Sequence, residues 1–226
     1  MGVELGTAES VAAYDARQGT DPAADDALLD RLGVAQGSVL VDLACGTGSF
    51  VVQAARRGAE AHGVDVGTEM LAFAARRADA AGVHVRWHHA GFLDYAHDGS
   101  PVDVITTKSA LHQLPDVFKQ EALRRAANML RPDGTFYLWD AIFGFDPADA
   151  VVELQRWVDA ARNTDSFTPE EFETHIREEY STYDWIIAGM LDRAGLQIVE
   201  HNTVTPTHAE FLCRRPSEPQ QARVGR

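Results

Sequence analysis

Several residue types are scarce in this chain of 226 residues, and each scarcity excludes a class of protein. Only two cysteines occur, Cys45 and Cys213, too few for a disulfide framework, so we expect both to be reduced thiols. No apolar run approaches the roughly 20 residues that cross a bilayer. The start of the chain, MGVELGTAES, lacks the basic segment and apolar stretch of a secretion signal. We therefore expect a cytoplasmic protein without a membrane span.

Positive charge is also scarce. Lys and Arg total 20 against 34 Asp and Glu, and the formal net charge is -14. The only lysines, Lys108 and Lys119, form no basic stripe for a phosphate backbone. Four arginines could form a local basic patch, although solvated helix faces are the favoured interpretation: Arg56, Arg57, Arg76 and Arg77. Nucleic acid is therefore a disfavoured partner, and the oligomeric state is not predicted.

The first two thirds of the chain alternate apolar segments with glycine-rich loops. After two amphipathic helices, at residues 10–18 and 21–32, strands and helices follow in turn. We expect strands at 38–44, 60–66, 83–91, 101–107 and 134–140, helices at 50–57, 68–81 and 115–130, and a turn at 131–134. This alternation predicts a parallel sheet with right-handed crossovers.

The last third breaks that alternation. Residues 144–183, with helical stretches at 147–162 and 168–179, read as a helical lid inserted between strands five and six. A helix at 185–193 and two strands at 196–204 and 207–215 follow, and their short link near Pro206 fits an antiparallel pair. We expect one α/β domain over 1–215, of which 1–36 carries the N-terminal helices, and a disordered tail at 216–226.

The most informative segment is VLVDLACGTGSF, from Val39 to Phe50. Glycines that follow a buried strand let the backbone approach a ligand and point helix amides at it. A dinucleotide-binding loop would place a third small residue three positions after Gly48, where this chain has Val51. A pyrophosphate ligand, and with it an NAD-dependent reductase, is therefore disfavoured.

Two carboxylates define the ligand further. Asp42, just before the loop, would repel a pyrophosphate but suits a ligand that carries an ammonium and a sulfonium. Asp65 ends the next strand, where an acidic side chain can accept both hydroxyls of a ribose. A nucleoside with positive charge points to S-adenosylmethionine (SAM).

The segments DLACGTG, GVDVGTEML, VDVITTKSALHQLPD and LRPDGTFYLWD, in this order, resemble the class I SAM-dependent methyltransferases over residues 36–214. The stretch 109–115 and the lid sequence EYSTYDW are similar to small bacterial methyltransferases of unassigned substrate. The resemblance implies a three-layer, Rossmann-like sheet of seven strands, mostly parallel, with an antiparallel last strand. It also implies SAM as the cofactor and S-adenosylhomocysteine (SAH) as its product.

Residue by residue, the resemblance places the methionine end of SAM on the glycine loop, the ribose on Asp65 and the adenine near Met70. Many relatives have Gly-Asp where this chain has Gly91 and Phe92, and Asp94 is a possible substitute for that adenine contact. The predicted cofactor-binding residues are Asp42, Ala44, Cys45, Gly46, Gly48, Asp65, Val66, Met70, Gly91, Phe92 and Lys108. Cys45 is interpreted mainly as a packing residue.

Methyl transfer is an in-line displacement from an activated sulfonium, so a base is needed only if the acceptor holds a proton. His112 follows the fourth strand and Asp140 ends the fifth, which makes them the candidate catalytic residues; a structural role for His112 is the alternative. The predicted substrate pocket could hold an aromatic acceptor, and its residues are Tyr14, His112, Phe145, Trp157, Tyr180 and Tyr183.

No metal site is expected. His88 and His89 are adjacent on a strand and face opposite sides. The lid carboxylates fit a solvated helix face better than a metal cluster: Asp165, Glu170, Glu171, Glu173, Glu178 and Glu179.

The favoured function is methyl transfer to an oxygen, nitrogen or carbon atom of a small molecule. TTKS stands where base and glutamine methyltransferases carry Asn-Pro-Pro or Asp-Pro-Pro, which argues against those acceptors. An RNA- or protein-modifying methyltransferase and a non-catalytic SAM-binding protein remain as alternatives, because one fold supports many functions.

Overall fold

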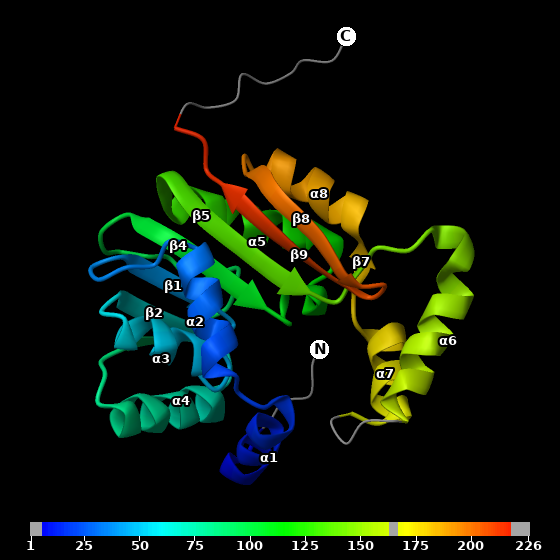
Figure 1. The fold of residues 1–226 in the computed structure, drawn as a ribbon, viewed down its shortest axis with the longest axis horizontal. Coiled ribbons are helices and arrows are strands. Elements are labelled where there is room, and N and C mark those ends of the chain that lie inside the picture. Colours follow the sequence, from blue (N-terminus) through cyan, green and yellow to red (C-terminus); the bar gives the residue numbers. More distant parts are fainter. Residues whose placement is uncertain (1–5, 163–166, 218–226) are drawn as a thin grey trace.

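The computed structural model describes residues 6–162 and 167–217. Seven strands form one twisted sheet (Figure 1). In chain order they are β1 (Val39–Leu43), β2 (Glu60–Asp65), β3 (Arg86–His89), β4 (Val102–Lys108), β5 (Leu130–Asp140), β8 (Gln197–Thr205) and β9 (His208–Arg214). The spatial order is β3-β2-β1-β4-β5-β9-β8. Only β9 runs antiparallel to its neighbours, which confirms the predicted sheet.

Helices cover both faces of the sheet. They are α2 (Pro22–Arg31), α3 (Ser49–Arg56), α4 (Thr68–Ala81), α5 (Asp116–Met129) and α8 (Asp184–Arg193), while α1 (Ala8–Gln18) packs against α4. Side chains alternate between the faces of β1: Leu40 packs with α2, α3 and α4, while Val41 packs with α5 and α8. The two cores that result give the three-layer architecture expected of alternating strands and helices.

Local signals set the helix ends. Asp21 caps α2 by accepting hydrogen bonds of 3.0 Å from the amides of Ala23 and Ala24, and Pro22 occupies the first turn, as helix N-termini favour. Gly82 ends α4 with a φ of 66°, a conformation that glycine adopts readily. Both predicted helix boundaries are confirmed.

The structure differs from the sequence-based prediction in two segments. The third strand covers Arg86–His89 instead of 83–91, because its pairing with β2 begins at His62 opposite Arg86; the preceding Val83 and Val85 pack in the core. Residues 131–134 belong to β5 and are not a separate turn, although Asp133 has a φ of 59° and the β4–β5 register shifts there.

The lid prediction is confirmed in its placement between β5 and β8. Its elements are β6 (Ile142–Phe143), a 3-10 turn (Pro147–Asp149), α6 (Ala150–Ala161), α7 (Pro169–Glu178) and β7 (Thr182–Tyr183). Strands β6 and β7 pair in parallel as a separate small sheet, and α6 and α7 lie together beside the main sheet (Figure 1). Asp165 and residues 218–226 of the predicted disordered tail lie outside the described residues.

Within the described ranges, no helix combines the length and apolar character that crossing a membrane requires.

Candidate functional site

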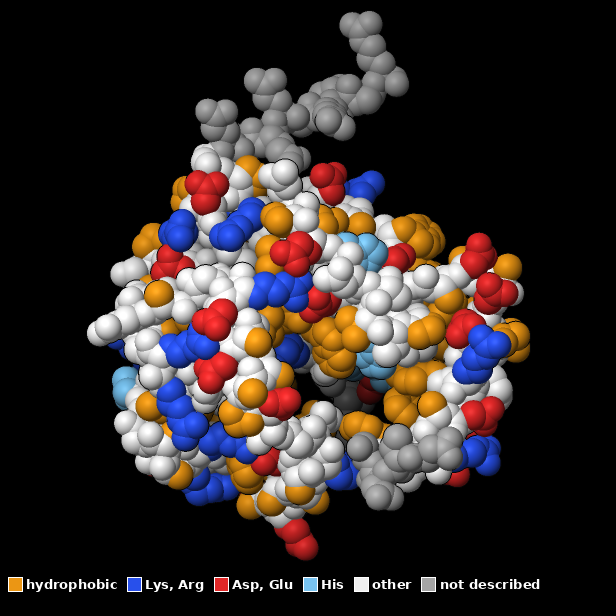
Figure 2. Space-filling view, viewed as in Figure 1, with side chains coloured by type: hydrophobic (Ala, Val, Ile, Leu, Met, Phe, Trp, Pro, Cys, Tyr) orange, Lys and Arg blue, Asp and Glu red, His pale blue; other side chains and the backbone are white. Residues whose placement is uncertain are grey.

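The carboxyl ends of the parallel strands meet at one edge of the sheet, which is where ligands bind in open α/β folds. A cavity of about 680 Å³ lies at this edge, beside the glycine loop and against α1 and α2. The surface is hollowed between the N-terminal helices and the lid (Figure 2). Five of the predicted cofactor residues line the cavity: Asp42, Ala44, Cys45, Gly46 and Lys108.

The glycine loop follows β1 in a conformation that depends on positive φ angles. Ala44, Gly46 and Gly48 have φ values of 58°, 54° and 77°. A Cβ added to Gly46 would meet nothing within 4 Å, whereas one added to Gly48 would stand 2.7 Å from the Cβ of Ala74. Gly48, predicted to line the cofactor, is therefore required by the packing of the loop on α4, and it does not line the cavity.

Asp42 is buried beneath the loop with 4% of its surface exposed. Thr106 donates a 2.6 Å hydrogen bond to its carboxylate. Burial raises the pKa of Asp42 to about 6, although the Thr106 bond and the charge of Lys108 oppose this rise. A buried carboxylate without a hydrogen-bonded cation favours a positively charged ligand.

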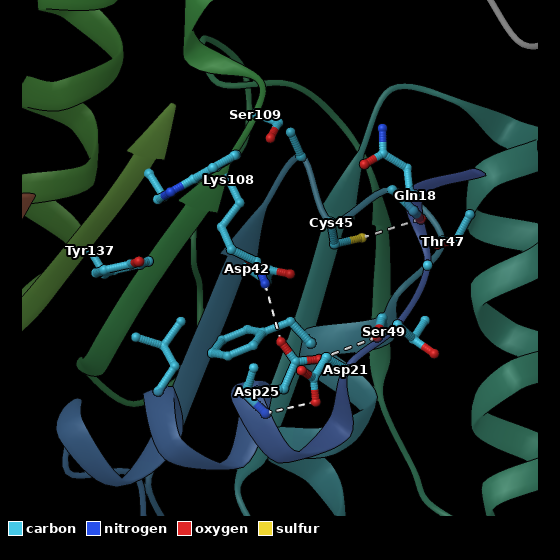
Figure 3. A pocket seen from close by; sticks show the side chains of 18 of the residues that line it. Gln18, Asp21, Asp25, Asp42, Cys45, Thr47, Ser49, Lys108, Ser109 and Tyr137 are labelled. Atoms are coloured by element: carbon cyan, nitrogen blue, oxygen red, sulfur yellow. Dashed lines mark hydrogen bonds and ion pairs between the residues drawn. The ribbon is translucent and has the colours of Figure 1, made fainter. Parts of the chain in front are cut away.

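Lys108 enters the cavity from the end of β4 (Figure 3). Its ammonium lies 3.3 Å from Asp25 of α2 and 4.5 Å from the centre of the Phe50 ring. The following residue, Ser109, has a φ of 52° and also lines the cavity. The end of β4 thus places one cation beside the buried carboxylate of β1.

Asp65 connects the first two loops of the edge. Its carboxylate accepts hydrogen bonds from the amides of Gly46, at 2.8 Å, and Gly67, at 2.7 Å. Beyond it, Val66 is 69% exposed and Met70 is half-buried. These residues do not line the cavity itself, and they form an open continuation of the same edge.

The loop after β3 completes that continuation. Gly91 donates its amide to Asp94 at 2.6 Å, and Phe92 is half-buried against the core. The carboxylate of Asp94, considered above as a substitute for the adenine contact, is thus engaged in holding its own loop.

Cys45 is half-buried at the wall of the cavity. Burial, followed by the charges of Asp42 and Asp65, raises the pKa of its thiol well above the ordinary value. Neither Cys45 nor Cys213 forms a disulfide. A neutral, half-buried thiol of this kind acts as a packing group.

The two candidate catalytic residues contact each other. His112 lies on a short 3-10 turn after β4 (Leu111–Gln113), and Asp140 ends β5 with 1% of its surface exposed. Asp140 contacts the Nδ1 of His112 and accepts a 3.1 Å hydrogen bond from its backbone amide. The other ring nitrogen, Nε2, lies 3.0 Å from Glu179 at the end of α7. Burial alone would lower the pKa of His112, but the two carboxylates raise it to about 9.

Four residues that the sequence analysis did not select as site residues surround this pair. Glu179 contacts the Nδ1 of His175, whose Nε2 lies 2.7 Å from the Ser181 hydroxyl. Burial would raise the pKa of Glu179, and the two histidines lower it. Lys119, 1% exposed on α5, contacts the backbone carbonyl of Tyr180. The spacing of His175 and Glu179 by four residues on one helix was the available signal.

The predicted substrate residues fall in three places. Tyr14 lines the cavity, and burial raises its pKa. Tyr180 is 47% exposed and donates its amide to the carbonyl of His112 at 2.8 Å. The other three predicted aromatic residues pack around Phe143, with ring centres 5.1 to 6.3 Å away: Phe145, Trp157 and Tyr183.

The lid also contacts the N-terminal helix across the mouth of the hollow. Arg17 of α1 pairs with Glu171 of α7 at 3.1 Å, and both side chains are partly exposed. This contact joins α1, which lines the cavity, to α7 of the lid.

This edge, with its glycine loop and two successive strand-end carboxylates, defines a cofactor-binding domain of the class I SAM-dependent methyltransferase type. Residues 40–134 match the methyltransferase domain family, so this part of the chain resembles the class I SAM-dependent methyltransferases. The cofactor of this class is SAM.

Known relatives agree with that assignment. The chain is 32% identical over 114 residues to the ubiquinone biosynthesis O-methyltransferase of Sodalis glossinidius. The matched region covers 50% of this chain and 45% of that protein. It is 28% identical to an uncharacterised methyltransferase of Geobacillus kaustophilus, over 59% of this chain and 61% of that one. The chain thus spans about half the length of the curated relatives it matches.

Among solved structures, phosphoethanolamine N-methyltransferase 2 of Haemonchus contortus superimposes with a TM-score of 0.72 and 18% identity. The match covers 93% of this chain and 57% of that chain. At this identity the likeness concerns the fold.

Proposed function

We propose that this protein transfers the methyl group of SAM to a small-molecule acceptor held between the sheet edge and the lid. The observation that carries the proposal is the shared edge: the cavity with Asp42 and Lys108 and the His112–Asp140 pair both lie at the ends of β1, β4 and β5. Cofactor and acceptor must meet there, because methyl transfer needs an in-line approach. We place the protein in the cytoplasm, where free thiols such as its two cysteines persist.

The cavity suits the methionine end of the cofactor. Its lining contains five carboxylates against two basic side chains, those of Arg31 and Lys108: Asp15, Asp21, Asp25, Asp42 and Glu210. Arg31 is already paired with Glu200 and Glu210. The remaining negative charge attracts an ammonium and a sulfonium, and Lys108 can pair with the methionine carboxylate.

The nucleoside end fits the open continuation of the edge. Asp65 already accepts two amides, and a carboxylate has further lone pairs for the ribose hydroxyls. The exposed Val66 and the half-buried Met70 and Phe92 offer apolar surface to an adenine ring. Gly91 shapes the loop that carries Phe92.

We assign acceptor binding to the site that His112 forms, with Asp140 as the residue that positions the ring. Asp140 fixes the tautomer and the direction of His112 through Nδ1. In this arrangement Glu179 faces Nε2, so an acceptor hydroxyl must compete with, or share, that carboxylate. The aromatic rings of Tyr14 and of the lid favour a flat acceptor, and the ubiquinone-pathway relative acts in the biosynthesis of such a compound.

The first test is calorimetric titration with SAH, with NAD as the control ligand. We expect SAH alone to bind, and Asp65→Ala to weaken it by about 1.5–3 kcal/mol because bonds to a charged group are lost. Asp79→Ala, at an exposed position of α4, is the matched control and should bind as the wild type does. Binding of NAD alone, or unchanged SAH binding in Asp65→Ala, would contradict the proposal.

A second test addresses turnover. A panel of phenols, catechols and quinols is incubated with radiolabelled SAM, and His112→Ala is expected to lose transfer while its SAH affinity stays the same. SAH binding without transfer to any acceptor would instead favour a non-catalytic SAM-binding protein. Tight, salt-sensitive binding of tRNA would favour an RNA-modifying enzyme.

A further inference from the structure

Two imidazole nitrogens and one carboxylate oxygen, all atoms that can ligate a metal ion, lie close together beside the proposed acceptor position. The Nε2 of His112, the Nδ1 of His175 and a carboxylate oxygen of Glu179 all lie within 4.8 Å of one another. Their side chains are 10%, 15% and 19% exposed. The set joins the loop after β4 with the end of α7, two elements that the fold brings together.

The backbone holds these elements in place independently of the three side chains. Tyr180 donates its amide to the carbonyl of His112, and Lys119 contacts the carbonyl of Tyr180. Glu179 is the C-cap residue of α7, four residues after His175, and its carboxylate contacts the Nδ1 of His175. Their approach to His112 is therefore part of the fold.

Each histidine has its outer nitrogen occupied. Asp140 contacts the Nδ1 of His112, and the hydroxyl of Ser181 lies 2.7 Å from the Nε2 of His175. Metal-bound histidines show this pattern, because a partner on the outer nitrogen fixes the tautomer and aims the other nitrogen at the ion. The two inner nitrogens face Glu179.

The carboxylate oxygen of Glu179 that lies between the two nitrogens lacks a well-formed hydrogen bond within the described part of the chain. The Oε2 of Glu179 is buried from solvent, and it accepts no hydrogen bond of acceptable geometry from any described residue. It nevertheless lies 3.0 Å from the Nε2 of His112 and next to the Nδ1 of His175. A buried carboxylate oxygen that two ring nitrogens approach without well-directed N–H groups fits a shared ion better than two hydrogen bonds.

We propose that His112, His175 and Glu179 bind one divalent transition-metal ion, of which Zn²⁺ is the best match. Two imidazoles and one carboxylate are ligands that Zn²⁺ accepts, and three protein ligands leave a fourth position open for another molecule. Asp140 and Ser181 support the two histidines from outside. The expectation of no metal was based on His88, His89 and the lid carboxylates, and it did not consider this combination.

The catalytic consequence rests on the proposed function. The open position takes the acceptor hydroxyl, and the ion lowers its pKa so that the proton passes to solvent. The acceptor oxygen then uses a lone pair to form the O–CH₃ bond, while the C–S bond of SAM breaks and its electron pair stays on sulfur, which yields SAH. His112 thus acts through the ion and does not itself remove the proton.

The experiment measures metal binding directly on the full chain. Protein stripped with EDTA is dialysed against Zn²⁺ at graded free concentrations, and bound zinc is counted by mass spectrometry. Co²⁺ is titrated in parallel, because its visible absorption reports coordination by protein ligands. We expect one equivalent of zinc, and roughly a 100-fold or greater loss of affinity in both His175→Ala and Glu179→Gln.

Two further variants sharpen the result. Glu178→Gln, at the exposed neighbouring position, should bind zinc as the wild type does. Asp140→Asn should lose about 10- to 100-fold, as is typical when an outer partner of a ligand is removed. Circular dichroism establishes that each variant is folded.

Failure of the wild type to bind a stoichiometric ion, or equal binding by Glu178→Gln and Glu179→Gln, would overturn the metal site. The wild-type measurement holds even if a ligand variant does not fold. SAH titration of the stripped protein separates this outcome from failure of the proposed function. None of the three proposed metal ligands is a predicted cofactor residue, so SAH should bind whether or not the metal does.

Discussion

Two buried histidines, His62 and His112, lie in separate histidine clusters and have pKa values shifted in opposite directions. In the first, the Nδ1 of His62 lies 3.0 Å from the Nε2 of His88, and the ring of His97 meets that of His62 edge-on at 4.7 Å. In the second, His112 and His175 lie with ring centres 4.8 Å apart. Burial lowers the pKa of His62 to about 4, whereas that of His112 is about 9.

Carboxylates account for the difference. His62 and His112 are both largely buried, at 1% and 10% exposure, and burial disfavours the charged form of each. His112 has Asp140 and Glu179 in contact, while the nearest acid to His62, Glu60, is 3.5 Å away and already paired with Arg86. His62 is therefore a neutral packing residue, whereas His112 is a charged or metal-binding residue.

The largest effect is expected from breaking the second cluster. Asp140→Asn keeps the shape of the side chain but removes the buried charge that faces His112. Because loss of one partner of a buried ion pair leaves the other uncompensated, the free energy of unfolding should fall by about 3–5 kcal/mol. Urea denaturation of this variant and of the exposed Asp149→Asn measures it. An equal, small loss in both variants would show that the pair is not the stabilising feature.

The first cluster should make the protein sensitive to acid. The pKa of His62 is about 4 in the folded protein and near 6.5 when unfolded, so its stabilising contribution is complete above pH 6.5 and is lost as the pH falls toward 4. Between pH 6.5 and 5 this amounts to about 2 kcal/mol. His62→Gln should lose less stability over that interval, as measured by urea denaturation at each pH. His84→Gln, at an exposed site, should keep the wild-type loss.

Asp42 extends the comparison to a buried acid without a hydrogen-bonded cation. Because its pKa is raised to about 6, the carboxylate is ionised at pH 7 and neutral at pH 5. SAH keeps its ammonium at both values, so its affinity should fall about tenfold between pH 7 and pH 5. Calorimetry on Asp42→Asn should show weaker binding at pH 7 and a smaller pH dependence. An unchanged dependence would place the titrating group elsewhere.

The smallest expected effect tests whether a nearby carboxylate raises the pKa of a buried histidine. Arg86→Gln releases Glu60, whose carboxylate can then act on His62. Since the Arg86–Glu60 pair is largely exposed and such pairs are weak, the titration midpoint of His62 should rise by less than about one pH unit. Proton NMR of the His62 ring detects the change, with Arg76→Gln as the control. A fall in the midpoint would contradict the role given to carboxylates.

Local sequence signals predicted much of this architecture. The cap at Asp21, the left-handed Gly82 and the glycine loop each depend on neighbouring residues, so these elements agree with the structure. His112 and Asp140 were both predicted at the sheet edge, because each follows a strand end in the motif order. Their mutual contact required the β4–β5 pairing that the parallel sheet provides.

The contacts that the lid makes with the site could not be predicted from the sequence pattern. Glu179 was assigned to a solvated face along with the other lid acids, since amphipathic spacing does not tell which end of a helix meets the sheet. Its contact with His112 depends on the angle at which α7 packs, which tertiary contacts such as that of Lys119 determine. Likewise Gly48 was explained by a ligand, whereas its neighbour across the helix layer is Ala74.

The Arg17–Glu171 pair has a kinetic consequence. It joins α1 to α7, and both partners are partly exposed to water, so dissolved ions screen it readily. Separation of this pair would free α1 and α7 to move apart. Residence times of cofactor and product should therefore shorten as ionic strength rises, which would let the salt content of the surrounding solution set the turnover rate without altering the chemical step.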